Sequence, residues 1–204
     1  MSDEFMEQNG HWRLRPRGLI SRLRLKRNSS AGKKMKQHFM MFAAYNQWAN
    51  GRIYDAVTEL DEEEFNRNVG AFFGSMMGTL NHLLATDRIW MKRFTGEGDA
   101  PTKLDAILHR ALPGLRLARE AEDRRIADWV GALSDKALSG RFSYMTVSDM
   151  RTVSQRLAPA LGHVFNHQTH HRGQAHAILT ILGRPSVQLD LAFFQRTDEG
   201  RAYA

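Results

Sequence analysis

The chain of 204 residues has no cysteine, only five prolines, and no apolar run approaching the roughly 20 residues that a membrane-spanning helix needs. The lack of cysteine excludes disulfide bonds, thiolate zinc sites, iron–sulfur clusters and a cysteine nucleophile. With 16 glycines and five prolines the chain is also unlike collagen or a low-complexity polymer. We therefore expect a soluble, cytoplasmic protein without a membrane span, long enough to bury one core of ordinary size.

Positive charge is distributed unevenly. Residues 1–34 carry nine Lys or Arg against three Asp or Glu, so +6 of the net charge of +7 belongs to them. This stretch alternates arginine with single apolar residues and cannot bury enough apolar surface to order itself. We interpret residues 1–34 as a basic, disordered N-terminal extension and residues 35–204 as the folded domain. An arm that binds nucleic acid or a membrane surface is the alternative, but the body has no basic recognition helix, which argues against nucleic acid as a partner.

From Met35 onward, apolar residues recur every three or four positions, which is typical of helices with one buried face. The four stripes are Phe42, Tyr45, Ala49, Ile53 and Val57; Phe72, Met76, Leu80, Leu83, Trp90 and Phe94; Leu115, Ala118, Ile126, Trp129, Val130 and Leu133; and Leu157, Leu161, Val164, Ala175, Ile178 and Leu182. Gly96 ends the second stripe and Pro113 begins the third. Residues 141–148 are β-like and predict a turn or ribbon in the crossing connection, and residues 189–195 predict a short last helix. Four long helices with one long crossover predict an all-α four-helix bundle.

The histidines carry the most specific signal, because five of the nine fall within residues 163–176. His163, His167 and His171 are spaced four apart, so on a helix their side chains lie one above another. Two imidazoles one turn apart can share a metal ion. A third ligand could be His163, although ligands eight residues apart are strained, or the second helix's single histidine, His82. The alternative is that these are core histidines with carbonyl or carboxylate partners.

These segments resemble a known family. HVFNHQTHHRGQ (163–174) resembles the hallmark of the DinB/YfiT-like metalloenzyme superfamily, and NHLLATDRIW (81–90) is similar to its second-helix motif. YNQWAN (45–50) resembles the family's first-helix opening, and LDLAFF (189–194) its closing segment. The resemblance spans about residues 35–196 in the correct order and includes none of the N-terminal extension.

The resemblance implies a four-helix bundle that holds one divalent metal ion, nickel, zinc or another first-row ion, through three histidines. Carried onto this chain, the ligands are His82, His167 and His171. Three neutral histidines leave positions open for water or substrate, which is typical of a catalytic site. Arg172 and Gln174, just after the last ligand, are expected to cap or support the site, with a structural salt bridge as the alternative.

The function that this implies is a metal-dependent enzyme of the thiol-transferase type, with a low-molecular-weight thiol as co-substrate and homodimers as the expected assembly. Because the chain has no cysteine, the sulfur would come from outside, and a divalent ion would lower the pKa of a bound thiol. A metal-dependent hydrolase with Asp87 or Glu97 as general base is one alternative. A non-catalytic, stress-response metal-binding bundle is another. Asn46 and Trp48 are expected near the mouth of the pocket, with a place in the core as the alternative for Trp48.

Overall fold

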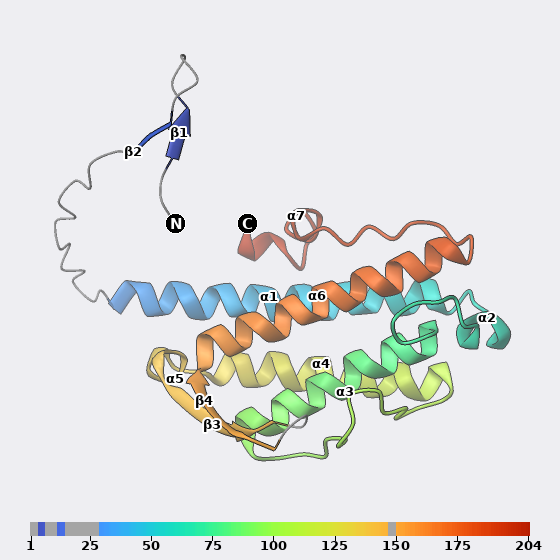
Figure 1. The fold of residues 1–204 in the computed structure, drawn as a ribbon, viewed down its shortest axis with the longest axis horizontal. Coiled ribbons are helices and arrows are strands. Elements are labelled where there is room, and N and C mark those ends of the chain that lie inside the picture. Colours follow the sequence, from blue (N-terminus) through green and yellow to red (C-terminus); the bar gives the residue numbers. More distant parts are fainter. Residues whose placement is uncertain (1–3, 7–11, 15–28, 147–149) are drawn as a thin grey trace.

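A four-helix bundle forms the body of the protein. The computed structural model describes residues 4–6, 12–14, 29–146 and 150–204 (Figure 1). The four long helices are α1 (Ser29–Val57), α3 (Met76–Thr95), α4 (Leu112–Ala132) and α6 (Leu157–Ile181). Helices α1 and α3 each pack against both α4 and α6, so α1 and α3 occupy opposite corners. The prediction of an all-α four-helix bundle is confirmed. None of the helices in the described part of the chain combines the length and apolar character that a bilayer span requires.

The remaining elements are short. They are β1 (Glu4–Met6), β2 (Trp12–Leu14), α2 (Glu62–Asn66), α5 (Asp135–Ser139), β3 (Arg141–Met145), β4 (Thr152–Arg156), α7 (Leu191–Phe194) and a 3₁₀ turn (Arg201–Tyr203). Strands β1 and β2 pair antiparallel, as do β3 and β4. Helix α7 is the short last helix that the sequence predicted, two residues shorter at its start and one at its end.

The position of the crossing connection differs from the one that the sequence predicted. Figure 1 shows α1 and α6 running one way and α3 and α4 the other, so the chain crosses the full length of the bundle between α3 and α4, at residues 96–111. The sequence placed the crossing connection at residues 141–148, which is wrong. Residues 141–145 of that segment form strand β3, which pairs with β4 between neighbouring ends of α4 and α6. Periodicity shows where helices lie but carries no information about which connection must cross.

Helix α1 begins earlier than the apolar stripe indicated. It starts at Ser29, so the predicted boundary between residues 34 and 35 falls inside it. Extending an existing helix adds one hydrogen bond per residue fixed, and this needs no apolar residue, which is why the stripe could not show the true start. The rest of the N-terminal extension, apart from β1 and β2, lies outside the described residues, and so does the predicted disorder there.

The start of α3 is built by a tight turn. Ser75 caps the helix, since its side chain accepts a hydrogen bond from the Gly78 backbone N–H, and Gly96 ends it in a left-handed conformation. A Cβ on Gly78 would lie 2.1 Å from the Phe73 carbonyl oxygen, so only glycine lets the turn pack this closely. The sequence placed Phe72 on the buried stripe of this helix. That is wrong, because Phe72 precedes the helix and is 84% exposed.

Two apolar cores lie at opposite ends of the bundle. At one end the C-terminal half of α1 packs against the starts of α3 and α4 and the end of α6, as Val57, Leu80 and Leu115 illustrate. At the other end the start of α1 packs against the start of α6 and the ends of α3 and α4, as with Phe39 and Val130.

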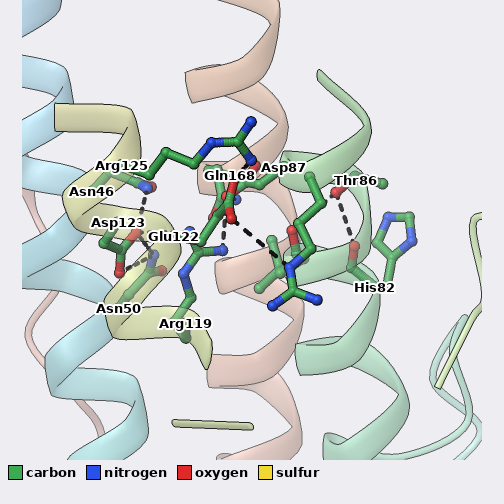
Figure 2. Close-up of polar contacts among 12 residues, drawn as sticks. Asn46, Asn50, His82, Thr86, Asp87, Arg119, Glu122, Asp123, Arg125 and Gln168 are labelled. Atoms are coloured by element: carbon green, nitrogen blue, oxygen red, sulfur yellow. Dashed lines mark hydrogen bonds and ion pairs between the residues drawn. The ribbon is translucent and has the colours of Figure 1, made fainter. Parts of the chain in front are cut away.

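Between the two cores, all four long helices contribute to a closed circuit of buried polar side chains, which we call the polar ring. Its members are Asn46 and Asn50 from α1, Asp87 from α3, Arg119 and Asp123 from α4, and Gln168 and Arg172 from α6. Arg119 donates to Asp87 at 2.7 Å and lies 2.9 Å from Asp123, as the central part of Figure 2 shows.

The other half of the circuit runs through amides. Asn50 donates to Asp123 at 3.0 Å and accepts from Arg172 at 3.1 Å, and Gln168 donates to Asp87. Such a network is stable only when its members face one another. It therefore fixes the rotation of α3 and α6 about their axes, and these two helices carry the candidate metal ligands.

Candidate metal centre

Three histidines from two helices meet at one point. The Nε2 atom of His82 on α3 lies 3.2 Å from Nε2 of His171 and 3.4 Å from Nε2 of His167, both on α6. One ligand atom from each of the three lies within 4.8 Å of the others. His82 and His171 are buried and His167 is half-buried. The structure thus brings together the three residues that the family resemblance named.

The hydrogen bonds made by the Nδ1 atoms show which ring nitrogens carry a free lone pair toward the centre. Nδ1 of His82 lies 2.7 Å from the Leu104 carbonyl oxygen, and Nδ1 of His171 lies 2.8 Å from Oε1 of Gln174. An oxygen of this kind only accepts, so both Nδ1 atoms carry the proton. In the neutral ring both Nε2 atoms are then unprotonated, and their lone pairs point at each other. A cation between them resolves this repulsion, and such outer partners are typical of metal-ligating histidines.

The crossing segment between α3 and α4 positions His82. The Asn81 side chain accepts from the backbone N–H groups of Leu108 and His109 at 2.8 and 2.9 Å, and donates to the His109 carbonyl at 2.8 Å. One side chain thus fastens the crossing segment to α3. As a result the Leu104 carbonyl lies within hydrogen-bond distance of His82, the residue next to Asn81.

An aromatic ring covers one side of the centre. Phe73 stacks on His82 with ring centroids 3.8 Å apart and planes 20° apart, and its ring lies 5.5 Å from that of His171. The sequence analysis missed Phe73. The signal that could have found it is an aromatic pair just before the cap of a histidine-bearing helix, which places a ring over the first turns.

The protonation state suits a metal site. Burial lowers the pKa of His82 to about 4, although its hydrogen bond with Leu104 acts in the opposite direction. Burial, followed by the nearby imidazole of His171, lowers the pKa of His167 to about 3. Burial also lowers the pKa of His171. All three imidazoles are therefore neutral at pH 7, the form that ligates metal ions.

The centre opens on one side into a cavity of about 280 Å³. Beyond His82 and His167, its walls are formed by Thr86, Trp90, Arg93, Leu104, Tyr144, Thr146 and His163. These described lining residues include no Asp or Glu. The cavity is therefore aromatic and cationic in character, and a small molecule inside it would contact His82 and His167.

Comparison with known proteins identifies the family of the chain. The model of the DinB family matches residues 35–202 of the chain. The chain belongs to the DinB family. It is 27% identical over 157 residues to protein DinB of Bacillus subtilis (strain 168), covering 74% of this chain and 89% of that protein. The crystal structure of a DinB-like protein from Bacillus cereus ATCC 10987 superposes with a TM-score of 0.59 at 15% identity, covering 74% of this chain and 94% of that one. The likeness to the crystal structure supports the fold.

The other histidines that the structure describes in this DinB family chain lie outside the three-histidine group. His163 is exposed, and its ring packs 5.1 Å from that of Trp90. His170 is exposed and hydrogen-bonds with Gln174. His176 accepts from the Val187 backbone N–H and contacts Ser186, which holds the segment after α6. His38 packs edge-on against Phe42, on α1.

Several residues considered for the site have other roles. Gln174 supports His171 as predicted. Arg172, Asp87 and Asn46 instead belong to the polar ring, and Figure 2 shows Asp87 directed into that ring while His82 points away from it.

The two remaining candidates lie elsewhere in the fold. Glu97 follows the end of α3 and is exposed. Trp48 packs against Phe193 and Phe194 of α7. The predictions that Asn46 and Trp48 lie at the pocket mouth are wrong, since neither lines the cavity. Asn46 is held in the bundle core by its hydrogen bonds with Asp123 and Arg172. Trp48 is held by the aromatic cluster near the C-terminus.

Proposed function

We propose that this chain binds one divalent transition metal ion, nickel or zinc, through Nε2 of His82, His167 and His171. The observation that supports this most is the convergence of the three nitrogens. Zinc–nitrogen bonds of 2.0–2.1 Å in a tetrahedral site require nitrogens about 3.3 Å apart. The distances from His82 are 3.2 and 3.4 Å. Two of the three nitrogen–nitrogen distances therefore match those of such an ion, and all three ligand atoms lie within 4.8 Å of one another.

We further propose that the chain is a metal-dependent transferase that uses a low-molecular-weight thiol as co-substrate. When bound, the ion would lower the pKa of a coordinated thiol, so that the sulfur would be present as thiolate near neutral pH. The chain itself has no cysteine. Its residues hold the ligand set, cover one side with Phe73, and leave the cavity side open for the co-substrate.

The same surroundings favour a thiol over water as the reacting group. Hydrolysis at such a site usually relies on a positioned general base. The described lining of the cavity offers no carboxylate for this role, and its one imidazole outside the ligand group, that of His163, packs against Trp90. Asp87 is engaged by Arg119 and Gln168 on the other side of α3, and Glu97 is exposed. The metal-dependent hydrolase is therefore the weaker alternative.

Cobalt substitution tests the proposal in two steps. The full chain loaded with Co²⁺ should show one bound ion per chain. His82→Ala should lose this ion, whereas His170→Ala, which changes the exposed histidine next to His171, should keep it. Adding a small thiol should then produce a sulfur-to-cobalt charge-transfer band in the near ultraviolet. A loaded protein whose spectrum ignores thiols would instead indicate a coordinatively filled, non-catalytic metal-binding bundle.

Three further expectations complete the proposal. Residues 35–204 form the functional domain, the protein assembles as a homodimer, and it acts in the cytoplasm. Sedimentation equilibrium of the full chain measures the second of these directly, since a dimer would have twice the mass of the 204-residue chain.

A further inference from the structure

Arg93 lies on the wall of the cavity beside the three-histidine group, held between two aromatic rings. Its guanidinium carbon is 4.6 Å from the ring centroid of Trp90 and 4.5 Å from that of Tyr144. Trp90 comes from α3 and Tyr144 from the hairpin strand β3, so two separate elements fix the position of one cation. Arginine stacked in this way keeps the N–H groups at its planar edge available.

Arg93 differs from comparable arginines in what it contacts. Arg88 and Arg125, half-buried on α3 and α4, both lie against the carboxylate of Glu122. Within the described residues, no carboxylate lies within 4 Å of Arg93 and no hydrogen-bond acceptor is assigned to it. Burial lowers the pKa of Arg93, as expected of a partly desolvated cation without an anionic partner. The fold therefore holds a cation ready for an anion that the described chain does not supply.

The geometry points to a carboxylate-bearing co-substrate, recognised by Arg93 through paired N–H···O hydrogen bonds while its other end reaches the three-histidine group. This inference rests on the proposed function, because it assigns the substrate class of the same site. Guanidinium and carboxylate match as planar, two-point partners. Arg93 is then a specificity-determining residue, which touches the co-substrate away from the reacting atom.

The spacing limits the length of that molecule. At a rise of 1.5 Å per residue, the Cα atoms of His82 and Arg93 are about 16 Å apart along α3. Helix side chains lean toward the N-terminus, so the guanidinium reaches back toward the histidines, as its contact with Trp90 shows. A co-substrate that touches both ends must still be several bonds long. The site therefore favours an extended acid of amino-acid to short-peptide size over an ion such as formate.

A matched pair of probes tests the inference. The cobalt-loaded full chain is titrated with 6-mercaptohexanoate and with 6-mercaptohexanol, which differ only in the acid group, and the sulfur-to-cobalt band is followed. The acid should bind at least about tenfold more tightly, since hydrogen bonds to charged groups are worth that much or more. Arg93→Met should remove the preference by lowering the affinity for the acid. Arg93→Gln serves as a second variant if the first is poorly folded.

Two controls distinguish a failure of this inference from a failure of the proposed metal site. Lys92→Met removes a charge from the exposed neighbour of Arg93 and should keep the preference for the acid. Equal binding of acid and alcohol by the wild type, or a preference that survives both Arg93 variants, would overturn the inference while the metal site stands.

If the chain takes no metal, or no thiol shifts the spectrum, the proposed function fails, and a second readout decides the inference. The Nε signal of Arg93 is then followed by nitrogen NMR in the metal-free protein. A saturable shift with hexanoate but not with hexanol would support an acid-binding Arg93. The absence of any shift would refute it.

Discussion

The polar ring makes a quantitative prediction about one arginine. Arg119 is 2% exposed and pairs with Asp87 at 2.7 Å and with Asp123 at 2.9 Å. Burial lowers its pKa, but the charges of Asp123 and Asp87 outweigh this and raise it, so the fold favours the charged arginine. Arg119→Met keeps much of the side-chain volume and removes the cation. Two carboxylates are then left buried without it.

The magnitude follows from this burial. Breaking a buried pair by removing one partner costs about 3–5 kcal/mol. For a chain of this size each kcal/mol lowers the melting temperature by about 2–4 °C. We therefore expect Arg119→Met to lower the melting temperature by about 6–20 °C. Circular dichroism at 222 nm during heating, with denaturant titration as a second measure, gives the value.

A matched control lies one turn earlier on the same helix. Arg116 pairs with Asp55 at 2.6 Å, nearly the same separation, but these side chains are 34% and 66% exposed. Exposed pairs contribute about 0–1 kcal/mol, so Arg116→Met should lower the melting temperature by no more than about 4 °C. Both substitutions change helix propensity equally, so the difference between them isolates burial. Equal shifts for the two variants would refute the argument that the ring stabilises the bundle core.

Three further predictions concern the pH dependence of the polar ring, the metal affinity and the turn before α3. The stability that Arg119→Met loses relative to the wild type should be smaller at pH 5 than at pH 7.5, as urea titrations at both pH values will measure. Burial already raises the pKa of Asp123 to about 6, and loss of the cation raises it further. A carboxyl group with a raised folded-state pKa stabilises the fold at low pH, and this stabilisation is lost as pH rises through that pKa. Gln174→Ala should weaken metal affinity by about 10- to 100-fold, because it removes the hydrogen-bond partner that orients His171. Gln174→Glu should retain the affinity, and competition with a chromogenic chelator will measure both variants. Gly78→Ala should destabilise the bundle by about 1–3 kcal/mol in a denaturant titration, because its Cβ would lie 2.1 Å from the Phe73 carbonyl oxygen.

The helical architecture could be predicted because apolar residues on one face of a helix repeat with a fixed period. The polar ring could not be predicted in this way. Asp87 and Arg119 are charged, so their positions read as solvent-facing until the partner on another helix is known. The same limit applies to the crossing connection at residues 96–111, which follows from helix direction and leaves no periodic signal.

The candidate site was accessible from sequence only in part. The spacing of His167 and His171 is a local signal that places both side chains on one face of a helix. His82 lies 85 residues before His167. Helix reasoning named it as one of two possible third ligands, and the resemblance to a family selected it over His163. Asn81 acts through hydrogen bonds with the crossing segment, which no spacing rule marks. Phe73 acts through ring contacts with His82 and His171, and its only sequence signal is its place just before the helix cap. Their roles follow from tertiary structure.

The central claim is that three histidine nitrogens bind one metal ion, and elemental analysis of the purified, untagged chain tests it most directly. The account predicts about one nickel, zinc or similar ion per chain in the wild type and in His170→Ala, and almost none in His171→Ala. A wild-type protein that stays metal-free after incubation with nickel and zinc would contradict the account. So would a His171→Ala variant that keeps its metal.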